Sequence, residues 1–180
     1  MCTTTSADSA CTNFGTDNAS ANSQNTAAGA NQNATTTNTT SGTANGFFAQ
    51  TNLGGNATAT NSGSNVGGFF AVTTAGGNAT ATNSGTADGF SAETNGGGNA
   101  TATNSGSNTD FGGFAAFTNM GGNATATNSG FNDNNILVVA VGGGNATVIN
   151  SGTSGTLGVT GQLIAIAAGG GQRHRDQFRH

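Results

Sequence analysis

One stretch of the chain decides how the rest folds: Phe69-Phe70-Ala71-Val72-Thr73-Thr74-Ala75-Gly76-Gly77-Asn78-Ala79-Thr80-Ala81-Thr82-Asn83-Ser84-Gly85. Its second half recurs unchanged at 54–63, 97–106 and 121–130, and in altered form at 143–152. Counted from the first Asn of each Asn-Ala-Thr, the copies follow at intervals of 23, 22, 21, 24 and 22 residues. The chain is therefore an array of repeats, and Gln172 takes the position of this Asn in one more copy.

A period near 22 residues is typical of a β-solenoid coil, because helical repeats are longer and richer in Leu, Glu and Lys. Asn, Gly, Thr and Ser disfavour helix, whereas Thr, Val, Ile and Phe favour strands. The hydrophobic content of 33% would also suit a disordered chain, but only 6% of the residues are charged and the apolar residues recur in register. We predict an all-β fold, a parallel β-solenoid (β-helix) of about six to seven coils with two short strands per coil.

The repeats divide the chain into three parts. Residues 1–23 are weakly periodic and predict either a degenerate first coil or a partner-binding arm. Residues 24–172 hold the solenoid repeats, and residues 173–180 form a basic tail or cap. Coil length varies only between each Ser-Gly and the next strand, and insertions that collect on one edge are what a solenoid permits.

The first strand of each coil is predicted to carry the core. Alternate residues of a strand face one way, and a large apolar residue, a small one and a Thr or Ala occupy alternate positions here. We expect the large residues to stack from coil to coil as a core ladder: Phe47, Phe69, Phe90, Phe114, Ile136 and Leu163. The residues between them vary, and Gln50 and Glu93 among them indicate an outward set.

In the second strand, Asn-Ala-Thr-Ala-Thr, we expect the alanines to face inward and the threonines outward. Hydroxyls turned into a narrow core would cost about 1–3 kcal/mol for each unsatisfied group. The outward threonines form a candidate binding face: Thr58, Thr60, Thr80, Thr82, Thr101, Thr103, Thr125 and Thr127. The corners carry Gly and Asn, which accept positive φ, and the stacked corner asparagines from Asn61 to Asn150 are predicted to form amide ladders.

The charges limit the partners. The net charge is −4, there is no Lys, and all three Arg lie in the last eight residues, so the body has no basic stripe for nucleic acid. No apolar run reaches the roughly 18–20 residues of a membrane span. Met1–Thr5 lacks the basic start and apolar core of a secretory signal.

The two cysteines are Cys2 and Cys11, and they make a poor metal site without nearby His. Two states remain open for them: a disulfide that closes the short terminal loop, or a pair of free thiols.

The sequence indicates no enzyme, cofactor or metal site. The carboxylates do not recur at a fixed repeat position, and His174 and His180 lie in the basic tail. Residues 131–135 offer oxygen ligands for Ca²⁺ but no repeated Asp pattern.

Asn-Ala-Thr matches the glycosylation sequon, but in a solenoid these asparagines lie about 4.8 Å apart, too close for glycans. We interpret the sequon as a by-product of the strand sequence.

Repeats built on Asn-Ala-Thr-Ala-Thr-Asn-Ser-Gly resemble the solenoid regions of bacterial surface proteins, adhesins and haemagglutinin-like exoproteins, over about residues 24–172. The resemblance implies a structural or adhesive role outside the cell or at its surface. We expect a building block of a filament, coat or adhesin that stacks head to tail as a homopolymer. The contacts expected at the ends are acidic on one side and basic on the other: Asp8, Asp17, Arg173, Arg175 and Arg179.

Two other functions fit the pattern. The Thr-x-Thr array resembles the ice-binding face of insect antifreeze proteins, which implies an ice surface as the partner. Alternatively, the aromatic residues predicted to be exposed, Phe48, Phe70 and Phe117, would suit a solenoid that binds glycans.

Overall fold

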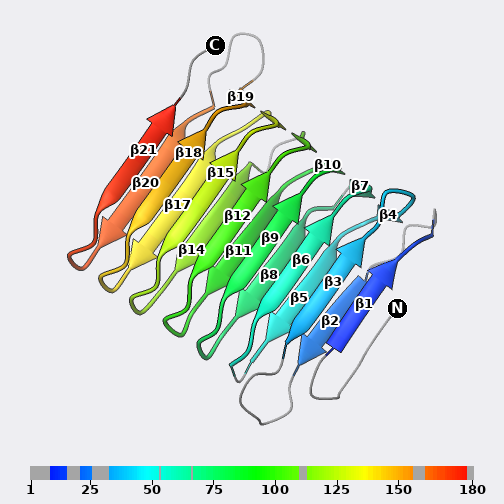
Figure 1. Ribbon diagram of the computed structural model, residues 1–180, viewed down its shortest axis with the longest axis horizontal. Helices are drawn as coiled ribbons and strands as arrows, with labels where there is room; N and C mark the ends of the chain where they lie inside the picture. Colours follow the sequence, from blue (N-terminus) through cyan, green and yellow to red (C-terminus); the bar gives the residue numbers. More distant parts are fainter. Residues whose placement is uncertain are drawn as a thin grey trace.

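The protein is a β-solenoid in which three parallel sheets run the length of a rod. The computed structural model describes residues 9–15, 21–25, 33–52, 54–65, 67–109, 113–155 and 161–177. All regular structure in these ranges is β-strand, and every strand pairing is parallel, so the predicted fold class is confirmed (Figure 1). Six complete turns pass through all three sheets, with two further strands before them and one after them.

Sheet A holds the Ala-Thr-Ala-Thr-Asn strands. Its eight strands are, in order, β1 (Ser9–Asn13), β3 (Ala34–Asn38), β6 (Ala57–Asn61), β9 (Ala79–Asn83), β12 (Ala100–Asn104), β15 (Ala124–Asn128), β18 (Ala146–Asn150) and β21 (Arg173–Gln177).

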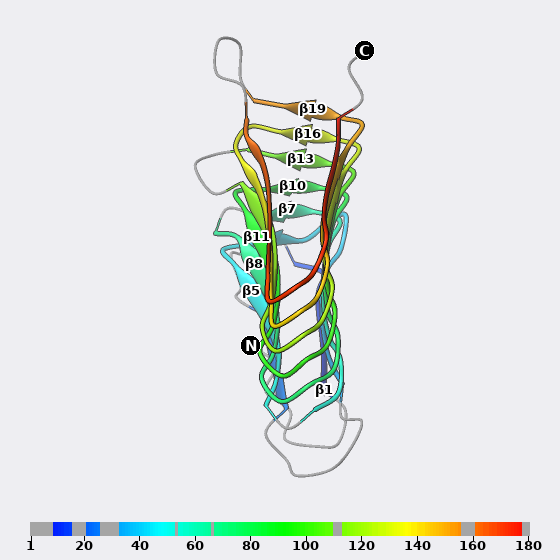
Figure 2. The same cartoon turned by 90° about the vertical axis from the view of Figure 1, so that its left-hand side faces the viewer.

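Sheet B holds the Phe-containing strands and stands opposite sheet A (Figure 2). Its seven strands are, in order, β2 (Ala21–Asn25), β5 (Phe47–Thr51), β8 (Phe69–Thr73), β11 (Phe90–Thr94), β14 (Phe114–Thr118), β17 (Ile136–Val141) and β20 (Leu163–Ala168).

Sheet C closes one side of the coil between sheets A and B (Figure 2). Its six strands have two residues each: β4 (Thr43–Ala44), β7 (Ser64–Asn65), β10 (Thr86–Ala87), β13 (Ser107–Asn108), β16 (Phe131–Asn132) and β19 (Thr153–Ser154).

The structure corrects one detail of the sequence-based prediction. Each complete turn has three strands rather than two, because the start of each variable linker pairs with its neighbours to make sheet C. Strands outside residues 24–172 also join the sheets, in the segments expected as a degenerate first coil or arm and as a tail or cap: β1 pairs with β3, β2 pairs with β5, and β21 pairs with β18. Backbone hydrogen bonds do not depend on side-chain identity, so segments without the repeat motif still join the sheets.

In the core, a stack of aromatic rings on sheet B packs against alanines on sheet A. The rings of Phe47, Phe69, Phe90 and Phe114 lie parallel, with successive centroids 4.7, 4.9 and 4.9 Å apart. Ile136 continues the column and is fully buried, whereas Leu163 is half-buried because β20 is the last strand of sheet B. The inward residues of sheet A are alanines in most coils, and these are fully buried. The small alanines leave room for the rings between the two sheets.

The inward threonines of sheet B are satisfied at the neighbouring corner. The hydroxyls of Thr51, Thr73, Thr94 and Thr118 donate to the carbonyl oxygens of Gly55, Gly77, Gly98 and Gly122 at 3.4, 3.3, 2.8 and 2.6 Å. Burial of these hydroxyls therefore leaves no unpaired polar group in this column.

Two constraints require glycine at the corners: positive φ at some positions and the close approach of successive coils at others. A Cβ on Gly98 would lie 1.5 Å from the carbonyl oxygen of Gly77, and one on Gly106 would lie 2.2 Å from that of Gly85. Neither Gly98 nor Gly106 has positive φ, so the positive φ expected at the corners does not explain them. It does apply at Gly97, where φ is 93°.

Candidate functional site

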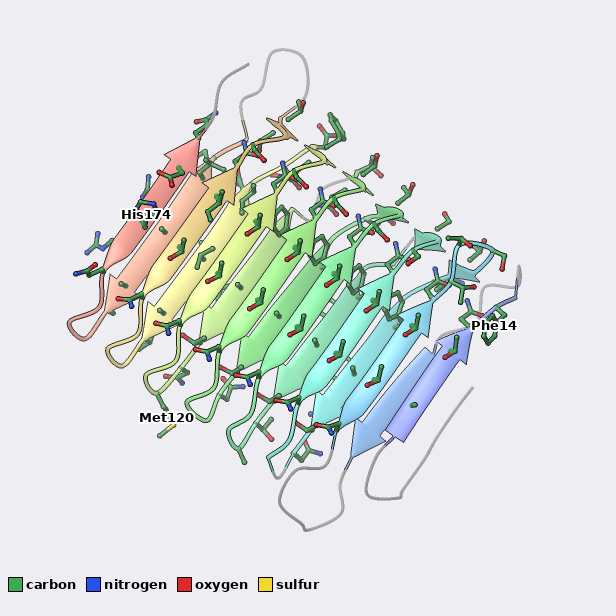
Figure 3. The ribbon with its side chains drawn as sticks, in the orientation of Figure 1. Phe14, Met120 and His174 are labelled. Atoms are coloured by element: carbon green, nitrogen blue, oxygen red, sulfur yellow. The ribbon has the colours of Figure 1, made fainter. Side chains whose placement is uncertain are left out.

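The outer surface of sheet A carries two straight columns of threonine, which we call the threonine face. The strand register aligns Thr58, Thr80, Thr101 and Thr125 in one column and Thr60, Thr82, Thr103 and Thr127 in the other. All eight side chains are half-buried, and Figure 3 shows the side chains of this surface in two rows across the strands. Neighbours are about 4.8 Å apart along a column, and the two columns are about 6.6 Å apart. The result is a flat, regular array of hydroxyl and methyl groups.

The two columns continue past these eight residues at both ends of sheet A. Thr35 and Thr37 on β3 continue both columns, and Thr12 on β1 adds one more threonine. At the other end Thr147 continues one column, but Ile149 replaces the threonine of the second. On β21 the positions are taken by His174 and Asp176, whose Nε2 and Oδ2 atoms lie 2.8 Å apart.

A buried asparagine ladder fixes the last residue of each sheet A strand. The side-chain amide of each asparagine donates to the Oδ1 of the next from Asn13 through Asn38, Asn61, Asn83, Asn104 and Asn128 to Asn150, at 2.8–2.9 Å. The same amides donate to backbone carbonyls of sheet C, as in the 2.7 Å bond from Asn104 to Phe131. The predicted corner ladder is therefore present, and it holds the threonine face to sheet C.

A second asparagine ladder lies just before the sheet A strands, on the surface. Here the backbone N–H of each marker residue donates to the Oδ1 of the preceding one, in a series of bonds of 2.9–3.0 Å: Asn33, Asn56, Asn78, Asn99, Asn123, Asn145 and Gln172. These are the sequon asparagines, and their side chains hold neighbouring coils together. This gives them a structural role and supports the interpretation of the sequon as a by-product of the strand sequence.

The C-terminal end of the rod presents basic side chains. Arg173 and Arg175 pair with Ala146 and Val148, which face inward, yet both arginines are exposed because β21 is the last strand of sheet A. The other residues proposed for the end contact, Asp8, Asp17 and Arg179, lie outside the described residues. The structure therefore places two of the five residues, and the contact itself stays a prediction.

Sheet B presents an outer face that differs from the threonine face. Phe48 and Phe70 lie next to each other with ring centroids 6.4 Å apart and planes tilted by 55°, while Phe117 lies in the other outward column of this sheet. Of the three aromatic residues predicted to be exposed, Phe70 is exposed, whereas Phe48 and Phe117 are half-buried. The sequence reasoning missed that aliphatic residues continue the same columns, although the outward positions of the last coils carry them: Leu137 with Val139 and Ile164 with Ile166.

Titratable side chains are scattered over the described residues. Among them no three His, Cys, Asp or Glu side chains gather to form a metal site. The Glu93 carboxylate accepts a hydrogen bond of 3.1 Å from the side-chain amide of Asn95. Cys11 is buried and disulfide-bonded, so the free-thiol alternative is wrong for this residue; the only other cysteine, Cys2, lies outside the described part of the chain.

Comparison with protein-family models, with curated proteins and with solved structures gives no match to this chain. In the part of the chain that the structure describes, no helix has the length and apolar character needed to cross a membrane. The fold thus defines the class, a β-solenoid repeat protein, and any inference about function rests on the ends and side faces of the rod.

Proposed function

We propose that this chain is a non-enzymatic structural protein, a rigid solenoid rod that serves in an extracellular filament, surface coat or adhesin. The observation that carries the proposal is that the ladders connecting successive coils run nearly the whole described length, from Asn13 to Asn150. Eight strands in sheet A give a rod about 34 Å long between the first and last strand. Such a rod holds its side faces at a fixed distance and orientation, which is what a structural element requires.

The ends of the rod support head-to-tail stacking. Each sheet ends in an edge strand whose backbone groups can pair with another chain. Another copy stacked on β21 would cover Arg173 and Arg175, and burying such charges is costly unless they are paired. The acidic residues expected at the opposite end, Asp8 and Asp17, supply such partners in this proposal. A heterologous contact of this kind does not close, so it propagates as a fibre.

Sedimentation and negative-stain electron microscopy at physiological salt test the stacking. We expect rods that lengthen with protein concentration and shorten at high salt, because salt screens exposed charges. The double variant Arg173→Glu with Arg175→Glu should prevent the lengthening. Thr147→Glu adds a negative charge on the outer face of β18, the strand next to β21, and should leave the lengthening unchanged. Single rods of constant length at high protein concentration would refute the stacking.

Ice binding by the threonine face is the second candidate, favoured by the flatness and regularity of the two columns. The alanines behind them are fully buried and the asparagine ladders flank each strand, so the strands that carry the threonines are held in register. Thermal hysteresis of the purified protein decides the question. Thr80→Tyr should abolish it, whereas Val72→Tyr, in the same coil on the outer face of sheet B, should not. Unshaped ice crystals and no hysteresis in the unmodified protein would exclude this function.

A further inference from the structure

The outer face of sheet B is apolar over most of its length, and we call it the apolar face. Its two columns run across six strands, from β5 to β20. One column contains Phe48, Phe70, Ser91, Ala115, Leu137 and Ile164, and the other contains Gln50, Val72, Glu93, Phe117, Val139 and Ile166. Glu93 is the single ionisable residue of the two columns. The opposite side of the same rod, sheet A, carries threonines, so the two broad sides differ sharply in polarity.

Several side chains on this side of the rod are open to solvent. Phe70, Val141 and Ile166 have exposed fractions of 43%, 40% and 44%. Two hollows interrupt the face: one of about 260 Å³ over Ser91 and Ala115, and one of about 500 Å³ beside Phe117, Val139 and Val141. Exposed apolar side chains gathered on one side of a protein that is otherwise polar outside mark an interaction site.

We propose that the apolar face binds a second copy of this chain, giving a dimer in which two sheets B pack face to face. Packed sheets lie about 10 Å apart with interdigitated side chains, and two identical solenoids match in strand spacing. Counting a width of about 4.8 Å for each strand, the six strands cover about 29 Å by 17 Å. This is about 500 Å² on each copy and about 1,000 Å² in total, which is near the lower limit for a specific interface. The area is therefore sufficient for a dimer, though a weak one.

The electrostatics of the face also suit a second copy. Glu93 is the only charged residue in the two columns, and the amide of Asn95 already donates to its carboxylate. Asp88 lines the smaller hollow at the edge of the face. Pairing two faces therefore brings together few charges. The hollow over Ser91 and Ala115 and the larger one beside Val139 can receive projecting side chains such as Phe70 from the second copy. A sugar would find few hydrogen-bonding groups here, because most residues of the columns are aliphatic or aromatic.

The dimer is independent of head-to-tail stacking, since it uses a side of the rod instead of its ends. It is a closed pair that stops at two copies, whereas stacking continues without limit. It also leaves both threonine faces outward, on opposite sides of the pair.

Sedimentation of the full-length protein over a range of concentrations tests the proposal, with Arg173→Glu and Arg175→Glu present throughout to suppress end contacts. We expect a monomer that becomes a dimer and nothing larger. Val139→Glu should weaken dimerisation about a hundredfold or more, because it buries an unpaired charge at the interface. Thr147→Glu is the matched control: it makes the same change of charge in the next sheet A strand along the chain, on the opposite side of the rod, and should leave the dimer unchanged. Circular dichroism confirms that both variants remain folded.

The proposal is overturned if the protein stays monomeric at all concentrations, or if the dimer is unaffected by Val139→Glu. It is equally overturned if a monomeric protein binds a glycan array or lipid vesicles through this face, which would make the partner something other than a second copy. If the protein forms no filaments but still forms the dimer, the stacking is refuted and the dimer proposal is unaffected.

Discussion

Replacing Asn104 by Ala tests the view that the buried asparagine ladder is a major source of stability. Asn104 is fully buried at the centre of the rod. Its Oδ1 accepts a hydrogen bond from Asn83 at 2.9 Å, and its amide donates to Asn128 Oδ1 at 2.8 Å and to the Phe131 carbonyl at 2.7 Å. Truncation to Ala removes all three bonds and leaves a small cavity.

The magnitude depends on which groups lose their partners. The Asn83 amide keeps bonds to the carbonyls of Gly85 and Ser107, so it stays satisfied. Asn128 Oδ1 and the Phe131 carbonyl each lose a donor, and a buried group left unsatisfied costs about 1–3 kcal/mol. We therefore expect the free energy of unfolding to fall by about 2–6 kcal/mol, a large part of the 5–15 kcal/mol typical of a domain.

Urea denaturation followed by circular dichroism measures this loss. Asn99→Ala is the matched control, because it makes the same substitution in the same coil in the exposed ladder, where Asn99 accepts from the Asn123 backbone at 3.0 Å. Water replaces that bond, so the control should lose no more than about 1 kcal/mol. Equal losses for the two variants, at unchanged dependence on urea, would refute the reasoning.

Three further substitutions test the packing. Gly98→Ala places a Cβ 1.5 Å from the Gly77 carbonyl oxygen, so it should separate two coils and lower the thermal midpoint sharply; an unchanged midpoint would show that the corner can relax. Phe90→Ala removes a ring stacked on both sides at 4.9 Å and should cost about 3–5 kcal/mol in urea unfolding, with a loss below 1 kcal/mol contradicting the stacked core. Ala87→Asn should raise the thermal midpoint: the amide of Asn108 donates to Asn132 Oδ1 at 2.7 Å, but Asn108 Oδ1 is buried without a partner, and Ala87 is paired with Asn108 in the preceding coil, where an Asn amide could donate to it. A lower midpoint would mean that the interior lacks room.

The inside and outside of the repeated strands could be predicted from the sequence. Strand side chains alternate with a period of two, and copies about 22 residues apart align, so the column from Phe47 to Phe114 and the outward threonines follow from the pattern. The alignment of Asn61 with Asn83 likewise predicts an amide ladder. These features depend on one repeat and its immediate neighbour.

Sheet C could not be predicted, and the terminal segments could not be assigned to one of their alternatives, because these sequences carry too little pattern. A two-residue strand such as Thr86–Ala87 shows no alternation, and its pairing depends on corners that already stack the coils. The strand Arg173–Gln177 contains charged residues at inward positions, and it joins sheet A through backbone hydrogen bonds that do not depend on its side chains.

Local alternation and identical copies are enough to define the coil, its period and the direction of each repeated side chain, and all of these can be read along the chain. The surfaces that the variable residues form depend instead on how the coils stack. Phe70, Val139 and Ile166 lie in different repeats, and parallel stacking in register brings them onto one side of the rod, opposite the threonine face. That placement requires linkers of unequal length to leave the register of the sheets unchanged, which is a property of the folded chain.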